Sequence, residues 1–102
     1  MAEVVTLTEA KTHLRIRDTE HDVDVQTVVT DADGVIRAYL GATNDPSWDA
    51  TSAPPPVKRS VLLLTAQFYE KGRGDDAMDS YVKTWDAIRS ILAAWGRVPT
   101  LA

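Results

Sequence analysis

Two histidines have the widest chemical repertoire in this sequence, since histidine can bind a metal or transfer a proton near neutral pH. His13 and His21 lack the H-E-x-x-H spacing that places two histidines on one side of a helix to bind zinc. The chain also has no cysteine, which excludes thiolate ligands, cysteine nucleophiles and disulfides. We therefore expect both histidines to lie at the surface, and we predict no metal site.

The acidic stretches do not form a calcium loop. Counted from Asp18, an EF-hand loop needs glycine at its sixth position and glutamate at its twelfth, where Val23 and Val29 stand instead. No G-x-S-x-G elbow is present, and the glycine pair within residues 72–74 lacks the G-K-[ST] ending of a phosphate-binding loop. The sequence therefore predicts a protein that is not an enzyme and uses no cofactor.

Length and composition indicate a small globular protein. The 102 residues suit a single domain, residues 1–102, and 44% of them are hydrophobic. No run approaches the roughly 20 apolar residues of a membrane-spanning helix, and the first residues lack the basic and apolar regions of a signal peptide. The net charge is −4, with acidic and basic residues interspersed. Gripping DNA would need clustered lysines and arginines, so a DNA-grasping module is disfavoured.

The elements that could position any site are helices. Apolar spacings of three and four residues predict a short first helix that begins at a capping box, Thr6 to Glu9, and ends near Arg15. A second helix is predicted from about Asp22 to Leu40, with its apolar residues on one arc. Gly41 follows it at a position where helices commonly end.

The second half of the chain predicts two more helices. Residues 42–55, rich in proline and turn-forming residues, predict a long flexible loop. The third helix begins near Pro56 and continues to Glu70; because it is apolar on several sides, we expect it to be central. The fourth runs from about Ala77 to Trp95, and residues 96–102 form an extended tail. The fold class is therefore all-α, a small bundle of about four helices.

The second helix also has an unusual polar face, on which small side chains lie at helical spacing: Thr27, Thr30, Gly34 and Ala38. This face is either an ordinary solvated surface or a place where a helix from a neighbouring subunit comes close. Trp48 is the only large apolar residue of the loop. It either folds back on its own core or anchors a partner.

Two stretches resemble sequences of a known family. Residues 7–16, LTEAKTHLRI, are similar to the "L-T-x-E-A-K-x-H-L-R-I" signature of the phage head–tail connector adaptor family. Residues 55–70, PPVKRSVLLLTAQFYE, resemble the family's "P-x-x-[IV]-K-x-A-[IV]-L-x-L-[VT]-A-x-[WF]-Y-E" helix. Residues 39–41 match its Tyr-x-Gly ending of the long helix, and residues 88–95 resemble its closure, "L-L-x-P-[YW]-R". In this closure Ala94 replaces the usual proline.

The resemblance implies a passive structural role without catalytic residues. Members of the family form a ring, usually of twelve subunits, beneath the portal protein of the filled capsid. The ring continues the DNA channel towards a stopper or tail-completion protein. The implied location is the head–tail junction of the virion, with the host cytoplasm as the place of assembly. An acidic channel would let DNA pass without specific binding, because it would avoid phosphate contacts.

A closed ring needs two different patches on each subunit. The candidate subunit interface comprises Thr27, Thr30, Gly34, Ala38 and Trp48, and the second patch is either the polar face of the fourth helix or the Pro-rich loop. The candidate residues for docking onto the portal protein are Trp95, Arg97, Val98 and Leu101.

Two other classes of function stay open. A generic helical interaction module would form a dimer, which light scattering would detect as a discrete two-fold species. A small hydrolase or metal-binding enzyme would bind metal stoichiometrically and would lose function when His13 or His21 is changed.

Overall fold

The computed structural model describes residues 2–71 and 78–95, and all elements in these ranges are helical. The elements in chain order are α1 (Leu7–Leu14), α2 (Asp22–Leu40), the short 3₁₀ turn η1 (Gly41–Thr43), α3 (Pro55–Ala66), the π-helical turn η2 (Gln67–Lys71) and α4 (Met78–Trp95). The prediction of an all-α fold with four helices is confirmed. None of the described helices is long and apolar enough to cross a membrane.

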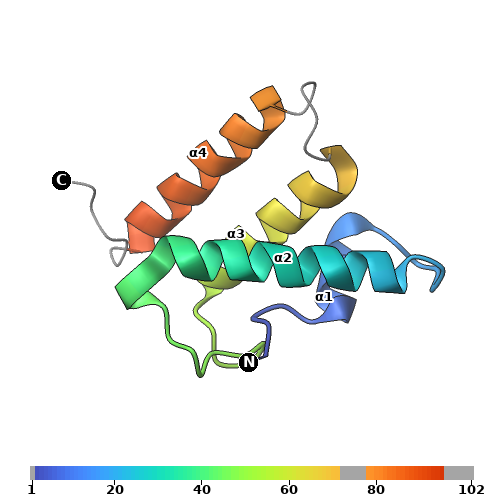
Figure 1. Ribbon diagram of the computed structural model, residues 1–102, viewed down its shortest axis with the longest axis horizontal. Coiled ribbons are helices and arrows are strands. Elements are labelled where there is room, and N and C mark those ends of the chain that lie inside the picture. The colour runs from blue at the N-terminus through green and yellow to red at the C-terminus, as the bar shows by residue number, and fades with distance from the viewer. Residues whose placement is uncertain (1, 72–77, 96–102) are drawn as a thin grey trace.

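The helices pack around α3. In Figure 1, α2 runs along the longest axis, α3 lies behind it, and α4 and α1 lie on opposite sides of α3. Helix α3 contacts α1, α2 and α4, which confirms that the third helix is central. The segment before α1 and the loop between η1 and α3 lie side by side along one edge of α2 (Figure 1).

The helix ends follow from the local sequence. At the start of α1, the Glu9 amide donates to the Thr6 hydroxyl at 3.0 Å and the Thr6 amide donates to the Glu9 carboxylate at 2.9 Å. This is the predicted capping box. Helix α1 ends at Arg15, which adopts a left-handed conformation with φ of 62°. Helix α2 ends at Gly41, whose φ of 55° is a conformation that glycine adopts without strain.

The third helix differs from its prediction at its C-terminal end. Its α-helical part stops at Ala66 and the chain continues as the π turn η2, whereas the sequence predicted one helix to Glu70. In this turn the Gln67 side chain is buried. Its amide nitrogen donates to the Ser80 hydroxyl and its oxygen accepts from the Thr84 hydroxyl, both at 3.1 Å. The π turn η2 therefore makes a polar contact with α4 that a hydrophobic pattern does not reveal.

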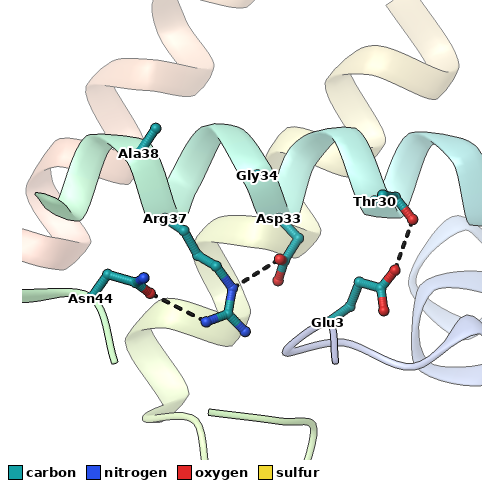
Figure 2. A pocket seen from close by; sticks show the side chains of 7 residues that line it. All are labelled: Glu3, Thr30, Asp33, Gly34, Arg37, Ala38 and Asn44. Carbon is teal, nitrogen blue, oxygen red and sulfur yellow. Dashed lines mark hydrogen bonds and ion pairs between the residues drawn. The ribbon is translucent and has the colours of Figure 1, made fainter. Parts of the chain in front are cut away.

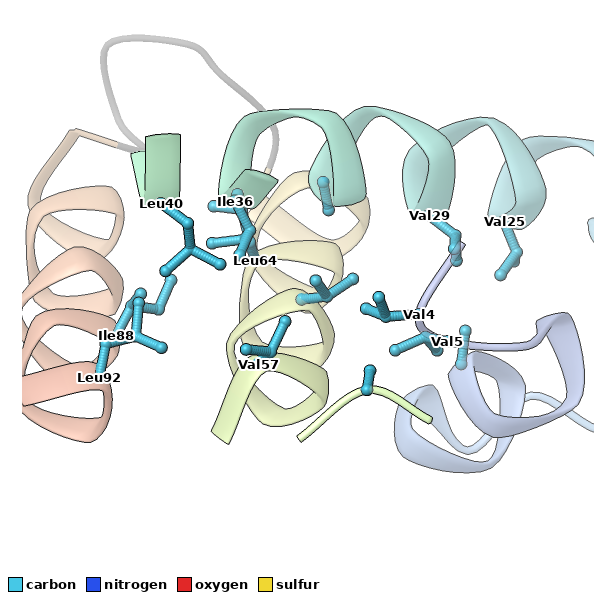
Figure 3. Packing of buried hydrophobic residues seen from close by; sticks show 14 residues of the cluster. Val4, Val5, Val25, Val29, Ile36, Leu40, Val57, Leu64, Ile88 and Leu92 are labelled. Carbon is cyan, nitrogen blue, oxygen red and sulfur yellow. The ribbon is translucent and has the colours of Figure 1, made fainter. Parts of the chain in front are cut away.

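The hydrophobic core lies where α2, α3 and α4 meet and extends to α1 (Figure 3). Its largest fully buried side chains include Ile36 and Leu40 of α2, Leu64 of α3 and Leu92 of α4. Val4 and Val5, which precede α1, are also buried. The segment before the first helix is therefore part of the core, although the helical pattern of the sequence begins only at Thr6.

Partly buried aromatic rings extend the core along α4. The Tyr39 ring of α2 lies 5.3 Å from that of Trp85, which in turn lies 6.4 Å from Tyr81. Tyr81 stacks on Phe68 of η2 with 6.3 Å between ring centroids. These rings join α4 to α2 and to η2. A separate pair, Trp48 and Trp95, lies at the C-terminal end of α4.

Candidate functional site

The predicted small-residue face of α2 is an open surface. Thr27, Thr30, Gly34 and Ala38 are all exposed. A β-carbon built on Gly34 would meet nothing within 4 Å apart from its chain neighbours and the backbone of its own helix, so no other described part of the chain covers this position. We call these four residues the small face of α2. It offers room for another polypeptide to approach the helix backbone.

A shallow groove of about 430 Å³ runs beside the small face. Thr30, Gly34 and Ala38 line it from α2, while Glu3 and Asn44 line it from the neighbouring segments. The Thr30 hydroxyl donates to the Glu3 carboxylate at 2.8 Å (Figure 2). Three stretches of the chain therefore form this surface together.

A buried ion pair lies at the base of the groove. Arg37 is 6% exposed and Asp33 7%, and the Arg37 Nε donates to the Asp33 Oδ2 at 2.9 Å (Figure 2). The pair also fastens the segment before α1. The Val4 amide donates to the Asp33 Oδ1 at 3.0 Å, and Arg37 Nη2 donates to the Ala2 carbonyl at 2.9 Å. Charges this deeply buried require such hydrogen-bond partners.

The same guanidinium fastens the loop that follows α2. Its Nη1 donates to the Asn44 side-chain oxygen at 3.2 Å and to the Asp45 carbonyl at 3.0 Å, and Nη2 donates to the Trp48 carbonyl at 3.0 Å. With the Asp33 and Ala2 contacts, these bonds use all five donors of the side chain. Arg37 therefore holds α2, the N-terminal segment and the loop in one arrangement.

A second cation fastens the far end of the loop. Lys58 of α3 donates from Nζ to the Ala50 carbonyl at 2.6 Å and to the Glu9 Oε2 at 2.7 Å. Glu9 and Lys58 belong to the two stretches on which the family resemblance is based, and the fold brings them together. The Lys58 ammonium and the amide and hydroxyl of Thr6 lower the pKa of Glu9 from its ordinary value of 4.5.

This lowered pKa predicts a pH-dependent contribution to stability. Stability gained from a depressed carboxyl pKa is present above 4.5, the unfolded value, and is lost as the pH falls through the lower folded value. We expect Glu9→Gln to lower the free energy of unfolding at neutral pH, and this difference from the wild type to shrink below pH 4.5. Urea titrations of both proteins across this range measure it; a pH-independent difference would contradict the prediction.

Between its two anchors, the loop is organised by hydrogen bonds within its own turns. Asp45 accepts from the amide and hydroxyl of Ser47 at 2.9 and 2.7 Å. The Asp49 carboxylate accepts from the amides and hydroxyls of Thr51 and Ser52, and these bonds lower its pKa to about 2. The described loop is therefore a series of Asx turns with fixed carbonyls, a detail that its composition alone did not indicate.

Trp48 folds back on the protein. Its side chain packs against the core, and its ring centroid lies 6.1 Å from that of Trp95, with 54° between the ring planes. Of the two interpretations offered for Trp48, the structure therefore shows the first. Its ring belongs to the end of α4 and not to the groove beside the small face. Trp95 is partly buried, while Arg97, Val98 and Leu101 lie outside the described residues.

The histidines do not converge on a site. His13 and His21 are both exposed, and the Nδ1 of His21 lies 3.9 Å from the Asp24 carboxylate. Within residues 2–71 and 78–95, no group of three or more histidine, cysteine, aspartate or glutamate side chains could hold a metal ion.

The pairing of Asp33 with Arg37 was not among the predictions from the sequence. One signal was available, because an acid and a base four residues apart stood on the flank of the apolar arc of α2. Helical geometry alone, however, does not tell a buried pair from an exposed one. The missing information was that the segment around Ala2 and the loop would cover this flank.

Comparison with known proteins identifies one family. The family model described as phage gp6-like head-tail connector protein matches residues 4–93. The match spans all four helices except the last two residues of α4. The comparisons with curated proteins and with solved structures returned no match.

Proposed function

Because the chain belongs to the phage gp6-like head-tail connector family, we propose that it is an adaptor subunit that forms a ring beneath the portal protein. The family is one of structural virion proteins. In this proposal about twelve copies surround the DNA channel, as the resemblance implies, and continue it from the portal to a stopper or tail component at the head–tail junction. The subunits assemble in the host cytoplasm. The family match over residues 4–93 is the observation that supports this function most directly.

Ring closure needs two complementary patches on different sides of the subunit. The first is the small face of α2, which has open space over Gly34. The second is the outer face of α4, where exposed residues recur at spacings of four and three: Lys83, Ala87, Ser90 and Ala94. Small side chains on both helices would allow close packing between neighbouring copies, with Lys83 offering a charge to the acids along α2.

The charge of the chain fits a channel that lets DNA pass. Each copy carries a net charge of −4, so a ring would repel phosphates rather than bind them. In this proposal the protein binds the portal through the end of α4 and the segment after it. The contacting residues are Trp95, Arg97, Val98 and Leu101.

Electron microscopy of the concentrated protein, alone and mixed with portal protein, tests this function. We expect rings under at least one of these conditions. A protein that stays monomeric at high concentration and never binds the portal ring would contradict the proposal. A discrete dimer would instead favour a general helical interaction module.

Gly34→Leu tests the interface on α2. The open space over Gly34 predicts that the leucine fits without a clash, and helix propensity predicts an unchanged or slightly higher stability, by up to about 1 kcal/mol. We expect the variant to remain helical by circular dichroism but to form no rings in sedimentation experiments. Thr12→Leu, at an exposed position of α1, is the matched control and should assemble normally. Rings formed by the Gly34 variant would exclude the small face from the interface.

A further inference from the structure

A series of contacts leads from the middle of α2 to the last turn of α4. Arg37 Nη2 donates to the Trp48 carbonyl at 3.0 Å, and the Trp48 ring packs against the Trp95 ring with 6.1 Å between centroids. Trp95 is the last residue of α4. The position of a buried side chain of α2 is therefore connected to the end of another helix through one loop residue.

The first contact of the series, between Arg37 and the turn that ends at Trp48, leaves the turn little freedom. The Trp48 amide donates to the Asp45 carbonyl at 3.1 Å, which closes a four-residue turn. Both carbonyls at the ends of this turn, those of Asp45 and Trp48, accept from the same guanidinium. Because that guanidinium is planar and is held by Asp33 within a buried site, it fixes the orientation of the whole turn.

The second contact of the series, between Trp48 and Trp95, lies at the last turn of α4, which is the part of a helix that opens most readily. The last four carbonyls of a helix have no partner within the helix, so its final turn opens most readily. In α4, Ile88 and Leu92 are fully buried, but Trp95 is only partly buried. The contact with Trp48 supplies a second surface against which this last turn packs.

We propose that Arg37 and Trp48 are positioning residues that fix the last turn of α4 and thereby hold Trp95, the candidate portal-docking residue of that turn, in place. The portal half of this proposal rests on the proposed function. The positioning half concerns the isolated chain and can be tested without a partner.

Amide hydrogen exchange, followed by NMR, tests the positioning half. We expect Trp48→Ala to speed the exchange of the amides of residues 92–95 by about threefold to tenfold, the effect of losing one aromatic contact. The amides at the centre of α3 report global unfolding, and the acceleration at 92–95 should exceed any change there. Trp48→Phe, which keeps a ring, should restore most of the protection.

Phe68→Ala is the matched control. It removes the ring that stacks on Tyr81, near the start of α4, and so also deletes one aromatic pair of this helix. In Phe68→Ala, the exchange of the amides of residues 92–95 should speed up no more than that of the amides at the centre of α3. If Trp48→Ala leaves these amides no faster than Phe68→Ala does, the positioning role of Trp48 is wrong.

Arg37→Lys tests the first contact of the series. Lysine keeps the positive charge, but its single ammonium cannot bridge the Asp45 and Trp48 carbonyls as the planar guanidinium does. We expect faster exchange at residues 92–95 than in the wild type, and no further acceleration when Arg37→Lys is combined with Trp48→Ala. If the two substitutions instead multiply each other's effect on the exchange rate at residues 92–95, Arg37 does not act through Trp48.

Binding to the portal ring separates this proposal from the proposed function. Trp48→Ala should weaken portal binding at least threefold in a sedimentation assay, and Phe68→Ala should bind as the wild type does. Faster exchange with unchanged portal binding would support the positioning half but overturn docking through the end of α4. Unchanged exchange would overturn the positioning half whatever the portal result.

Discussion

Replacing Arg37 by methionine is expected to lower the free energy of unfolding by about 3–5 kcal/mol. The substitution leaves the Asp33 carboxylate, only 7% exposed, without its cation, and it removes the donors to the Ala2, Asp45 and Trp48 carbonyls. An uncompensated buried charge is the main cost. Urea denaturation of both proteins at neutral pH, followed by circular dichroism, measures the difference.

Arg59→Met is the matched control for this prediction. Arg59 is an exposed arginine of α3, so its replacement should change the stability by about 0.5 kcal/mol or less. Combining Asp33→Leu with Arg37→Met should recover part of the loss, because no charge then remains buried. A loss below about 1 kcal/mol for Arg37→Met alone would contradict the idea that the ion pair organises the fold.

Leu64→Ala is expected to destabilise the protein by about 2–5 kcal/mol, the range for truncating a buried leucine. Leu64 is fully buried on α3, the helix that contacts α1, α2 and α4 (Figure 3). The cavity left by the truncation would lie among side chains of several helices, which limits how far any one of them can move to fill it. Thermal and urea denaturation provide the measurement.

Leu62→Ala is the control within the same helix. Leu62 is only partly buried, so its truncation should cost clearly less than that of Leu64. Equal losses for the two variants would mean that the outer side of α3 is as tightly packed as its inner side. That result would contradict the described arrangement, in which α3 turns Val57, Val61 and Leu64 towards the core.

The sequence predicted the helices well because their ends are determined locally. The capping box at Thr6 and Glu9 marks the start of α1, and Gly41 marks the end of α2. The π turn after Ala66 was missed, because apolar residues continue at helical spacing through it. Val4 and Val5 were missed for a different reason: they are buried by tertiary packing, in a segment with no periodic pattern.

The candidate site was only partly predictable. Spacing alone placed Thr27, Gly34 and Ala38 on one side of α2, and the structure leaves them exposed together. The pairing of Arg37 with the N-terminal segment and the loop could not be predicted, because its partners lie up to 35 positions away and are mostly main-chain atoms. Hydrophobic periodicity carries no information about such contacts. Trp48 was left with two interpretations for the same reason.

The way Arg37 holds its neighbours also bears on how this protein can change over evolutionary time. Three of the five hydrogen bonds from its guanidinium end on main-chain carbonyls, those of Ala2, Asp45 and Trp48. Every amino acid supplies a carbonyl, so substitutions along the outside of the loop leave these acceptors in place. The loop can therefore vary an exposed side chain such as that of Pro46 and adapt to new neighbours while its path stays the same.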